Sequence, residues 1–255
     1  TNKKFELKSF QKKSVSHALA LRDSANFSVP GAGKTWMAYA TYFLAKERQE
    51  EPSVNKLLVV CPLPAFQVWE GEYKTITKNN PSEYSPENNV YRIADKSTDV
   101  TLIPNLPDRF EIILINYDKI HNPQYFAALQ LMLKNHNFFM ILDESHKIKN
   151  PESNTGEAIR ELANLAQRKL ILTGTPMPNF HKDLWNQFQF LFPNQNLLGS
   201  YENYKNKVKN NKEEQRRVAQ LLHPFFTRVT DNQLGLPRIE TPIFDCPMDP
   251  FQQEI

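Results

Sequence analysis

The chain has 255 residues, enough for one large domain or two small ones, and 40% of them are hydrophobic, including 17 Phe and 9 Tyr. Such a composition can fill a substantial core, which excludes global disorder. With 31 basic and 28 acidic residues the net charge is +3, a balance that neither requires nor excludes a nucleic-acid partner.

Cysteine usage and hydropathy restrict the compartment. Cys61 and Cys246 lie far apart, and Cys61 falls in an apolar run, so the pattern gives no disulfide framework and fits a reducing interior. The first thirty residues lack the apolar core of a signal peptide, and no apolar run approaches membrane-spanning length. We therefore expect a soluble intracellular protein with no membrane partner.

The first predicted element is a helix within residues 5–22, where apolar residues recur near helical spacing. It contains Gln11, just upstream of a glycine-rich turn. A Gln amide both donates and accepts hydrogen bonds, so Gln11 could read the edge of an adenine base. The alternative is a solvated Gln on a helix, which is the commoner case.

A glycine-rich turn with the sequence SVPGAGKT occupies residues 28–35, between an apolar run at 25–29 and an amphipathic run at 36–48. Strand, glycine turn and helix in this order are the context of a Walker A phosphate-binding loop, in which backbone N–H groups and the helix start face a polyphosphate. Lys34 would reach the β- and γ-phosphates of ATP, and the Thr35 hydroxyl would ligate Mg²⁺. The predicted nucleotide-binding residues are Gln11, Pro30, Gly31, Ala32, Gly33, Lys34 and Thr35. Because Ser28 stands where the pattern has Gly, an ordinary Pro-Gly turn that caps a helix is the alternative.

Short apolar runs alternate with helical patterns along the rest of the chain. Buried strands are predicted at residues 56–61, 111–116, 138–142 and 169–172, with weaker candidates at 90–94 and 100–103. Helices are predicted at residues 65–75, 121–135, 157–165, 184–191, 201–209 and 213–222. This alternation predicts βαβ units, so we expect an α/β fold with a mostly parallel central sheet flanked by helices.

The domain organisation follows from the same pattern. Residues 1–230 are expected to form one lobe, which includes a helical extension at about 181–222. Residues 231–255 contain four prolines and little helical periodicity, so they are predicted to be a linker that leaves the domain.

The predicted strand at 138–142 runs directly into Asp143 and Glu144. This is the Walker B arrangement, in which Asp143 would hold Mg²⁺ and Glu144 would polarise the water that attacks the γ-phosphate. The alternative, an acidic pair that caps a helix, is disfavoured because a GKT loop lies upstream. Since ligands bind beyond the carboxyl ends of parallel strands, the phosphate loop, DESH (143–146) and TGTP (173–176) should converge at one edge.

The sequence DESHKIKN at 143–150 resembles the D-E-A-H-R-I-K-N motif of Swi/Snf-type ATPases, a branch of the superfamily 2 helicases. Further segments resemble that family in the same order. LKSFQ is similar to its L-R-P-Y-Q motif, PGAGKT to M-G-L-G-K-T, and PLPAFQVWEGEYK to P-L-S-L-L-x-N-W-x-x-E-F. LTGTPMPN is similar to L-T-G-T-P-x-Q-N, DLWNQFQFLFP to E-L-W-S-L-L-N-F-L-x-P, and LLHPFFTRVT to L-L-R-P-F-x-L-R-R-T. The resemblance covers nearly the whole chain, from about Leu7 onward.

The resemblance implies a RecA-like P-loop NTPase lobe of an ATP hydrolase that translocates on double-stranded DNA. It implies that Gln11 contacts adenine, that the loop residues and Lys34 bind phosphates, and that Asp143 and Glu144 are the metal and water-activating carboxylates. The residues implied to couple the nucleotide state to nucleic acid and a second lobe are His146, Thr173, Gly174 and Thr175. The segments implied to track one DNA strand contain Pro62, Trp69, Asn116 and Tyr117, of which Trp69 is more typical of a core residue.

Four positions depart from the family pattern. Ser28 and Val29 stand where acidic residues are usual, Pro64 replaces a Ser, and Ser145 replaces Ala or Gly. The departures at Ser28, Val29 and Pro64 favour a divergent member, in the cytoplasm or nucleoid if bacterial or viral, over a nuclear remodeller of a eukaryote. A basic cluster could also meet phosphates, although Glu213 and Glu214 interrupt it and a solvated helical face is favoured. Its members are Lys205, Lys207, Lys209, Lys212, Arg216 and Arg217.

Helicase-type ATPases place their site between two RecA-like lobes, and the second lobe supplies arginine fingers. No residues after Met248 could form such a lobe, so the resemblance implies a first lobe that is nearly inactive alone and works with a second lobe and accessory subunits. Two alternatives stay open: another superfamily 2 motor, such as an RNA helicase or a restriction or defence translocase, and a nucleotide-gated binding module without turnover.

Overall fold

The computed structural model describes residues 6–48, 53–78, 89–93, 100–177 and 181–234. One seven-stranded sheet lies at its centre, with the strand order β3-β4-β2-β5-β6-β1-β7, and every neighbouring pair is parallel. The strands are β1 (Asp23–Asn26), β2 (Lys56–Val60), β3 (Val90–Ile93), β4 (Ile112–Ile115), β5 (Phe138–Asp143), β6 (Arg168–Leu172) and β7 (Phe226–Thr227). The α/β fold with a parallel sheet is confirmed.

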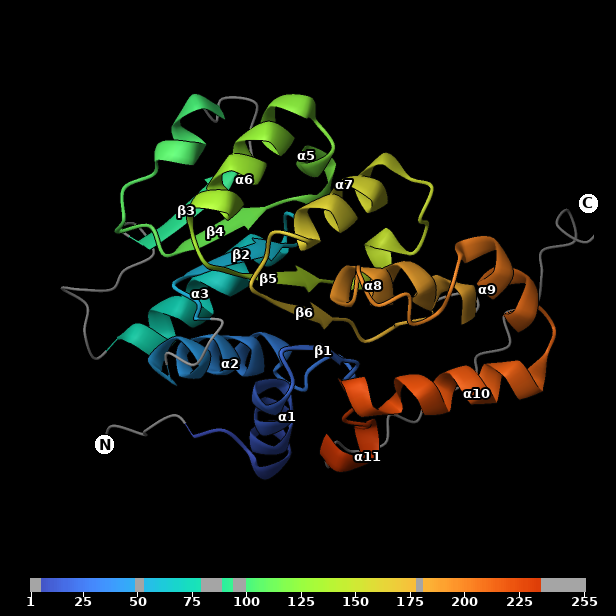
Figure 1. The fold of residues 1–255 in the computed structure, drawn as a ribbon. Coiled ribbons are helices and arrows are strands. Elements are labelled where there is room, and N and C mark those ends of the chain that lie inside the picture. The colour runs from blue at the N-terminus through green and yellow to red at the C-terminus, as the bar shows by residue number, and fades with distance from the viewer. Residues whose placement is uncertain (1–5, 49–52, 79–88, 94–99, 178–180, 235–255) are drawn as a thin grey trace, which may run out of the picture.

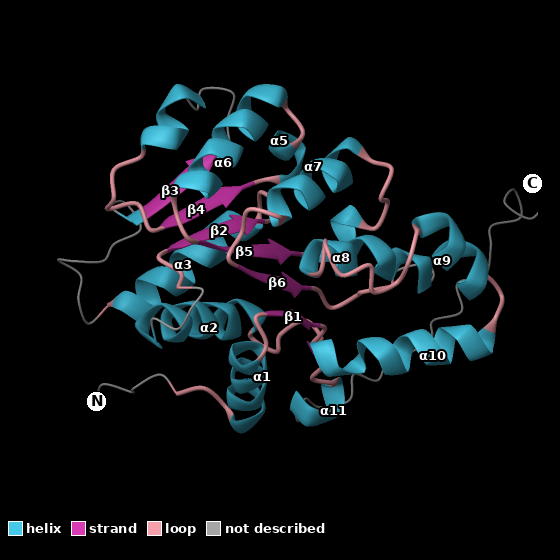
Figure 2. Cartoon of the chain, in the orientation of Figure 1, coloured by secondary structure: helices cyan, strands magenta, loops and turns pink. Residues whose placement is uncertain are grey.

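Helices cover both faces of the sheet (Figures 1 and 2). One face carries α1 (Ser9–Ala20), α2 (Lys34–Arg48) and α3 (Ala65–Thr77). The other carries α5 (Tyr117–Ile120), α6 (Pro123–Asn135), α7 (Asn154–Ala163) and α8 (Leu184–Leu191). Successive strand residues alternate between the two cores, as in β2, where Leu57 and Val59 pack on the first face and Leu58 and Val60 on the second. Burial on both faces explains why these strands are continuous apolar runs.

The chain then forms a helical extension beside the sheet and returns to it (Figure 1). The extension contains α9 (Tyr201–Val208) and α10 (Lys212–Leu222), which belong to the second core through Tyr204 and Leu222 among others. After it, β7 pairs with β1, so that Phe226 lies beside Ala25. The single-turn helix α11 (Asp231–Leu234) follows.

Most predicted elements are present, with two differences in strand position. The strand candidate at 100–103 is wrong: Val100–Asn105 is a 3₁₀ helix in which Pro104 has no N–H for a ladder and Leu102 is 54% exposed. The strand predicted at 25–29 is shifted to residues 23–26, and the N–H groups of Phe27 and Val29 after it bond to the carbonyls of Thr227 and Val229.

Two further differences concern the C-terminal part of the chain. Strand β7 was not predicted, since two residues carry too little periodicity to identify a strand. Residues 231–234 form the helical turn α11, and the rest of the predicted linker, 235–255, lies outside the described residues. The lobe boundary at residue 230 stays a prediction.

A buried ion pair fixes β1 against β6 at the edge opposite the phosphate loop. Asp23 and Lys169 are partners in the β1–β6 register. Asp23 Oδ1 accepts a hydrogen bond from the Lys169 backbone N–H at 2.7 Å, and Lys169 Nζ lies 3.2 Å from Asp23 Oδ2. Burial raises the pKa of Asp23 and lowers that of Lys169, so each charge depends on its partner.

We expect Lys169→Met to lower the free energy of unfolding by about 3–5 kcal/mol, because it leaves the Asp23 carboxylate buried without its counter-charge. Urea denaturation of the purified chain measures this change. Lys134→Met, at an exposed position on α6, is the matched control and should change stability by less than about 0.5 kcal/mol. Equal stabilities of the two variants would contradict the structural role of the pair.

Candidate nucleotide-binding site

The phosphate loop joins the end of β1 to the start of α2. Gly31 and Gly33 have φ angles of +80° and +79°, in the left-handed region that favours glycine. A Cβ atom on Gly33 would also lie 2.5 Å from Gln11 Nε2, so any larger residue there would displace the Gln11 side chain. The two glycines therefore give the loop its turn and bring Gln11 against it.

Gln11 is buried and holds the loop from α1. Its Nε2 donates to the Ala32 carbonyl at 2.9 Å, and its Oε1 accepts from the Lys8 N–H at 2.9 Å. Each amide atom thus keeps one further hydrogen-bonding valence, one donor and one acceptor, which matches the edge of adenine. The solvated-helix alternative for Gln11 is wrong, because only 7% of the residue is exposed.

The contacts of Ser28 show why a side chain stands where the loop pattern has glycine. The side chain is fully buried, and its Oγ accepts from the Val229 N–H at 3.0 Å. The adjacent Val29 N–H donates to the Val229 carbonyl at 3.1 Å. The hydroxyl therefore fastens the phosphate loop to the chain that follows β7, 201 residues later.

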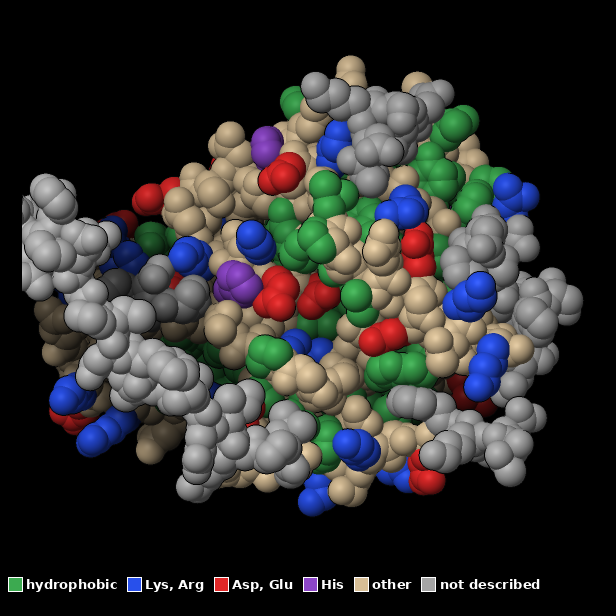
Figure 3. Space-filling model, turned by 180° about the vertical axis from the view of Figure 1, so that it is seen from behind, with side chains coloured by type: hydrophobic (Ala, Val, Ile, Leu, Met, Phe, Trp, Pro, Cys, Tyr) green, Lys and Arg blue, Asp and Glu red, His purple; other side chains and the backbone are tan. Residues whose placement is uncertain are grey.

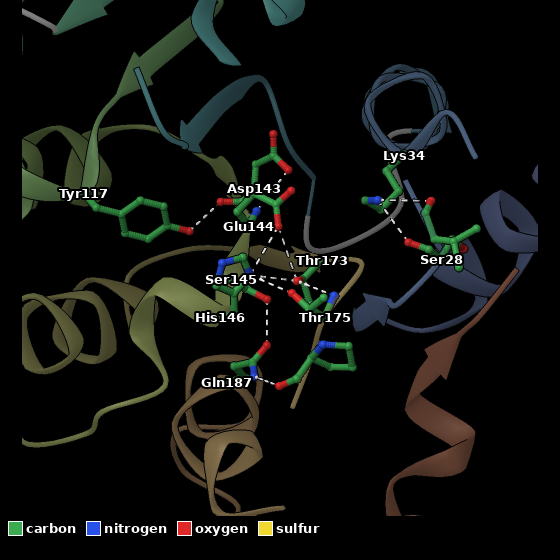
Figure 4. A network of polar contacts seen from close by, with 12 residues as sticks. Ser28, Lys34, Tyr117, Asp143, Glu144, Ser145, His146, Thr173, Thr175 and Gln187 are labelled. Atoms are coloured by element: carbon green, nitrogen blue, oxygen red, sulfur yellow. Dashed lines mark hydrogen bonds and ion pairs between the residues drawn. The ribbon is translucent and has the colours of Figure 1, made fainter. Parts of the chain in front are cut away.

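Lys34 turns back onto its own loop. Its Nζ donates to the carbonyls of Ser28 at 3.0 Å and Val29 at 3.3 Å (Figure 4). Burial lowers the pKa of Lys34, while the charges of Glu144 and Asp143 oppose that shift. The ammonium group thus lies on backbone oxygens that a polyphosphate would have to replace as its acceptors.

Asp143 is the last residue of β5 and accepts hydrogen bonds from three other residues. Its Oδ2 accepts from the Trp69 indole N–H of α3 at 2.9 Å, and its Oδ1 accepts from the Glu144 N–H at 3.0 Å. Its backbone carbonyl accepts from the Tyr117 hydroxyl at 2.7 Å. Burial raises the pKa of Asp143, and the Trp69 hydrogen bond opposes the shift. The pKa of nearby Glu72 is raised to about 7 by burial and by the charge of Asp143.

Glu144 sits in a left-handed backbone conformation with φ of 54°, uncommon for a residue with a side chain and frequent at functional sites. Its Oε2 lies 3.2 Å from His146 Nδ1 and 3.4 Å from the Thr173 hydroxyl that donates to it. Burial lowers the pKa of His146, so a neutral ring makes these contacts at neutral pH. Nδ1 of His146 also lies 3.0 Å from Thr173 Oγ1 and 3.4 Å from Thr175 Oγ1 (Figure 4).

The TGTP segment also contacts the phosphate loop. The Thr173 N–H donates to the Asn26 carbonyl at 3.2 Å, and a Cβ on Gly174 would lie 3.0 Å from Pro30 Cδ. The phosphate loop, DESH and TGTP therefore converge at one sheet edge, as the strand pattern predicted.

The candidates for nucleic-acid contact divide by exposure. Trp69 is fully buried against the Tyr39 ring, whose hydroxyl donates to the Trp69 carbonyl, so direct contact by Trp69 is wrong and the core interpretation is confirmed. Tyr117 is 7% exposed, and its hydroxyl donates a hydrogen bond to the Asp143 backbone carbonyl. Asn116 keeps a buried Oδ1 with no hydrogen-bond partner among the described residues, and Pro62 is half-buried at the end of β2.

Sequence reasoning missed several residues that organise the site. They are the Trp69 indole as a donor to Asp143, the Tyr117 hydroxyl, Ser28 as an anchor, and Gln187 of α8, which binds Ser145 and Pro176. The departures from the family pattern at Ser28 and Ser145 were sequence signals of two of these contacts.

The residues fit a Mg²⁺ ion held mainly by a nucleotide. The described part of the chain contains no group of three or more His, Cys, Asp or Glu that could hold a metal. Asp143 keeps acceptor capacity on both carboxylate oxygens, and Thr35 is half-buried near the start of α2. One carboxylate, one hydroxyl and substrate phosphates are a usual Mg²⁺ environment. No helix among the described residues is long and apolar enough to cross a membrane.

The predicted basic cluster is partly neutralised. Lys205 lies 3.6 Å from Glu202 and Arg217 lies 3.5 Å from Glu214 along the same helices, as on a solvated face. A cavity of about 320 Å³ has Lys182, Lys205 and Lys209 in its wall, beside α9 and α10. Among the described side chains in Figure 3, acidic and basic groups are mixed over the surface in view.

We expect Trp69→Phe to raise the pH below which Mg²⁺-nucleotide binding is lost. Removing the indole N–H removes a bond to the ionised Asp143, so the pKa of Asp143 rises further above its usual value. Since a carboxyl group must be ionised to ligate Mg²⁺, the midpoint of a pH titration followed with a fluorescent nucleotide should move upward. Trp185→Phe, which removes an indole bond to the Gly199 carbonyl, is the matched control, and a shift of equal size there would contradict the role of Trp69.

Three comparisons with known proteins agree on the family. The family model of the SNF2-related domain matches residues 27–255. The TATA-binding protein-associated factor MOT1 of Saccharomyces cerevisiae is 34% identical over 149 residues, which are 58% of this chain and 7% of that protein. The ISWI chromatin-remodeling complex ATPase ISW2 of the same yeast is 26% identical over 226 residues, 84% of this chain and 18% of that protein.

Solved structures extend the comparison to the fold. The Sulfolobus solfataricus SWI2/SNF2 ATPase core in complex with dsDNA matches with a TM-score of 0.70 and 25% identity over 91% of this chain and 46% of that one. The same core without DNA in its description matches with a TM-score of 0.65 and 26% identity over 93% and 47%. The chain thus spans about half of these structures and less than a fifth of the two yeast relatives.

The expected bacterial or viral source finds no support in these relatives, which come from yeast and an archaeon. The sheet has the predicted RecA-like arrangement, and the family model covers all but the first 26 residues. The chain belongs to the SNF2-related domain family.

Proposed function

We propose that this chain is the ATP-binding lobe of a DNA-dependent ATPase of the Swi/Snf type, which hydrolyses ATP to move on double-stranded DNA once paired with a second RecA-like lobe. The observation that carries the proposal is the convergence of the phosphate loop, Asp143–Glu144 and TGTP at one sheet edge. Membership of the SNF2-related family supports the choice of ATP and DNA among the ligands of P-loop folds.

The site residues take distinct roles in this proposal. Gln11 presents its spare donor and acceptor to adenine, while the loop N–H groups and Lys34 bind phosphates. Thr35 and Asp143 hold Mg²⁺, which neutralises developing phosphate charge when bound. Glu144, the more exposed carboxylate of the pair, orients the attacking water and accepts its proton. His146, Thr173, Gly174 and Thr175 transmit the nucleotide state to bound nucleic acid.

Double-stranded DNA is the proposed nucleic acid. The archaeal relative whose description includes dsDNA matches over 91% of this chain, which supports a duplex partner. The segments after β2 and β4, which contain Pro62 and Asn116, lie at the same end of the sheet as DESH, since β2 is a parallel neighbour of β5 and β4 is a parallel neighbour of β2. Trp69 and Tyr117 stabilise that edge through their hydrogen bonds to the Asp143 carboxylate and the Asp143 backbone carbonyl.

Replacing Glu144 by Gln tests the enzyme. In the full-length natural protein with Mg²⁺-ATP and duplex DNA, we expect a stimulated ATPase rate that Glu144→Gln reduces at least about 100-fold, because the proton acceptor is lost. Glu157→Gln, on the exposed surface of α7, is the matched control and should keep the wild-type rate.

Three outcomes would contradict parts of the proposal. Stimulation by RNA duplexes only would identify another superfamily 2 motor. An ATPase rate that nucleic acid does not stimulate and Glu144→Gln does not reduce would show that the protein is not a nucleic-acid-dependent motor. Nucleotide binding without turnover would leave the chain as part of a nucleotide-gated binding module.

The chain alone, residues 1–255, should bind Mg²⁺-ATP weakly and turn it over negligibly with or without duplex DNA. The reason is that the lobe carries its own Lys34 bonds to loop carbonyls and lacks the arginine fingers of a second lobe, which contribute about 10³- to 10⁵-fold in rate. Titration calorimetry and a phosphate-release assay measure the two quantities. A DNA-stimulated rate near that of the full-length protein would refute this division of labour.

A further inference from the structure

A buried hydrogen bond connects DESH to helix α8. Ser145, the residue after Glu144, donates its Oγ–H to Gln187 Oε1 at 2.7 Å (Figure 4). Both residues are fully buried. A hydroxyl and an amide are costly to bury unless they are paired, so each of the two side chains depends on the other.

The same glutamine extends the connection to TGTP. Gln187 Nε2 donates to the Pro176 carbonyl at 2.7 Å and to the Asp183 carbonyl at 3.0 Å. Because two carbonyls can be met only by the NH₂ group, the amide orientation is fixed and Oε1 must face Ser145. A continuous path of hydrogen bonds therefore runs from the residue after Glu144 to the last residue of TGTP.

Both side chains depart from the family pattern together. Ser145 stands at the position of Ala or Gly in the DEAH motif, and Gln187 stands at the first of the two leucines in E-L-W-S-L-L. A hydrogen-bonded pair thus occupies positions where the pattern has two apolar side chains. The substitution adds a polar contact that the chain would not need for packing alone.

We propose that Ser145 and Gln187 are positioning residues that hold Glu144 in register with TGTP, in addition to His146. The two connections start at the two residues that follow Glu144: His146 reaches Thr173 and Thr175, whereas Ser145 reaches Pro176 through Gln187. A movement of TGTP is therefore passed to the left-handed backbone of Glu144 through both of the residues that follow it. This inference rests on the proposed ATPase function of the site.

The test compares four variants of the full-length protein: Ser145→Ala, Gln187→Leu, the double variant, and Gln189→Leu. Ser145→Ala leaves Gln187 Oε1 unpaired, and Gln187→Leu leaves the Ser145 hydroxyl unpaired and removes the donor to the Pro176 and Asp183 carbonyls. The melting temperature of each should therefore fall by about 3–10 °C, with the larger loss in Gln187→Leu. The double variant also removes the unpaired Ser145 hydroxyl and should melt above Gln187→Leu, while the Pro176 and Asp183 carbonyls still lack the Gln187 donor. Gln189, two positions along α8, has no hydrogen bond to DESH or TGTP within the described residues and serves as the control with wild-type kcat.

Catalysis separates positioning from packing. We expect kcat with duplex DNA to be about 3- to 30-fold lower in both single variants and in the double variant, with KM for ATP within about twofold of wild type. A double variant that recovers kcat together with its melting temperature would overturn the proposal, because the pair would then serve stability alone. Unchanged kcat in the single variants would overturn it as well.

Hydrogen exchange gives a readout that needs no turnover. Backbone amides at residues 173–175 and 177 should exchange about 3- to 30-fold faster in Gln187→Leu and in the double variant, since TGTP has lost its bond to α8. If the wild-type protein shows no stimulated ATPase activity, the proposed function fails. The exchange rate then tests by itself whether Gln187 holds TGTP against α8. Equal exchange in wild type and variants would overturn it.

Discussion

The pairing of β5 with β6 is the constraint on which the whole site depends. Asp143 is the register partner of Leu172, so the residues that follow the two strands leave the sheet side by side. Glu144 then meets Thr173, and His146 meets both threonines of TGTP. Because β6 also pairs with β1, the phosphate loop is brought to the same edge and Gly174 packs on Pro30. One strand order, β5-β6-β1, thus brings the phosphate loop at 28–35 to DESH and TGTP, which begin at residues 143 and 173.

The buried carboxylate of Asp143 is the electrostatic centre of this edge. Burial alone would favour its protonated form, which cannot hold a divalent cation. The Trp69 indole and the Glu144 N–H each donate to one of its oxygens and favour the ionised form. Since Trp69 is itself held by Tyr39, the aromatic core under α2 and α3 contributes directly to the charge state of a surface site. A change in the packing of this aromatic core would therefore also change the hydrogen bonding of Asp143.

The apolar runs and the short motifs of the sequence predicted most of the strands and the position of the candidate site. Buried strands such as β2 and β5 are continuous apolar runs, and the glycine turn, Asp143–Glu144 and TGTP lie where alternating strands and helices put them. The failed strand at 100–103 reads V-T-L-I, and only its exposure and the following Pro104 distinguish it. Contacts such as Ser28 with Val229 or Ser145 with Gln187 join residues 42 to 201 positions apart, so no periodicity could reveal them.

Ser28 shows how a phosphate loop tolerates a side chain where its pattern has glycine. The Ser28 N–H is already bonded to Asn26 Oδ1, and its hydroxyl points to Val229, so the substitution withdraws no free loop N–H from a phosphate. The Ser28 carbonyl meanwhile accepts from Lys34. A bound polyphosphate must therefore outcompete these backbone oxygens for the ammonium, and only the difference between the two sets of bonds contributes to affinity. The anchor at Val229 keeps those oxygens in place, so the segment after β7 helps to determine the shape of the loop that Lys34 contacts.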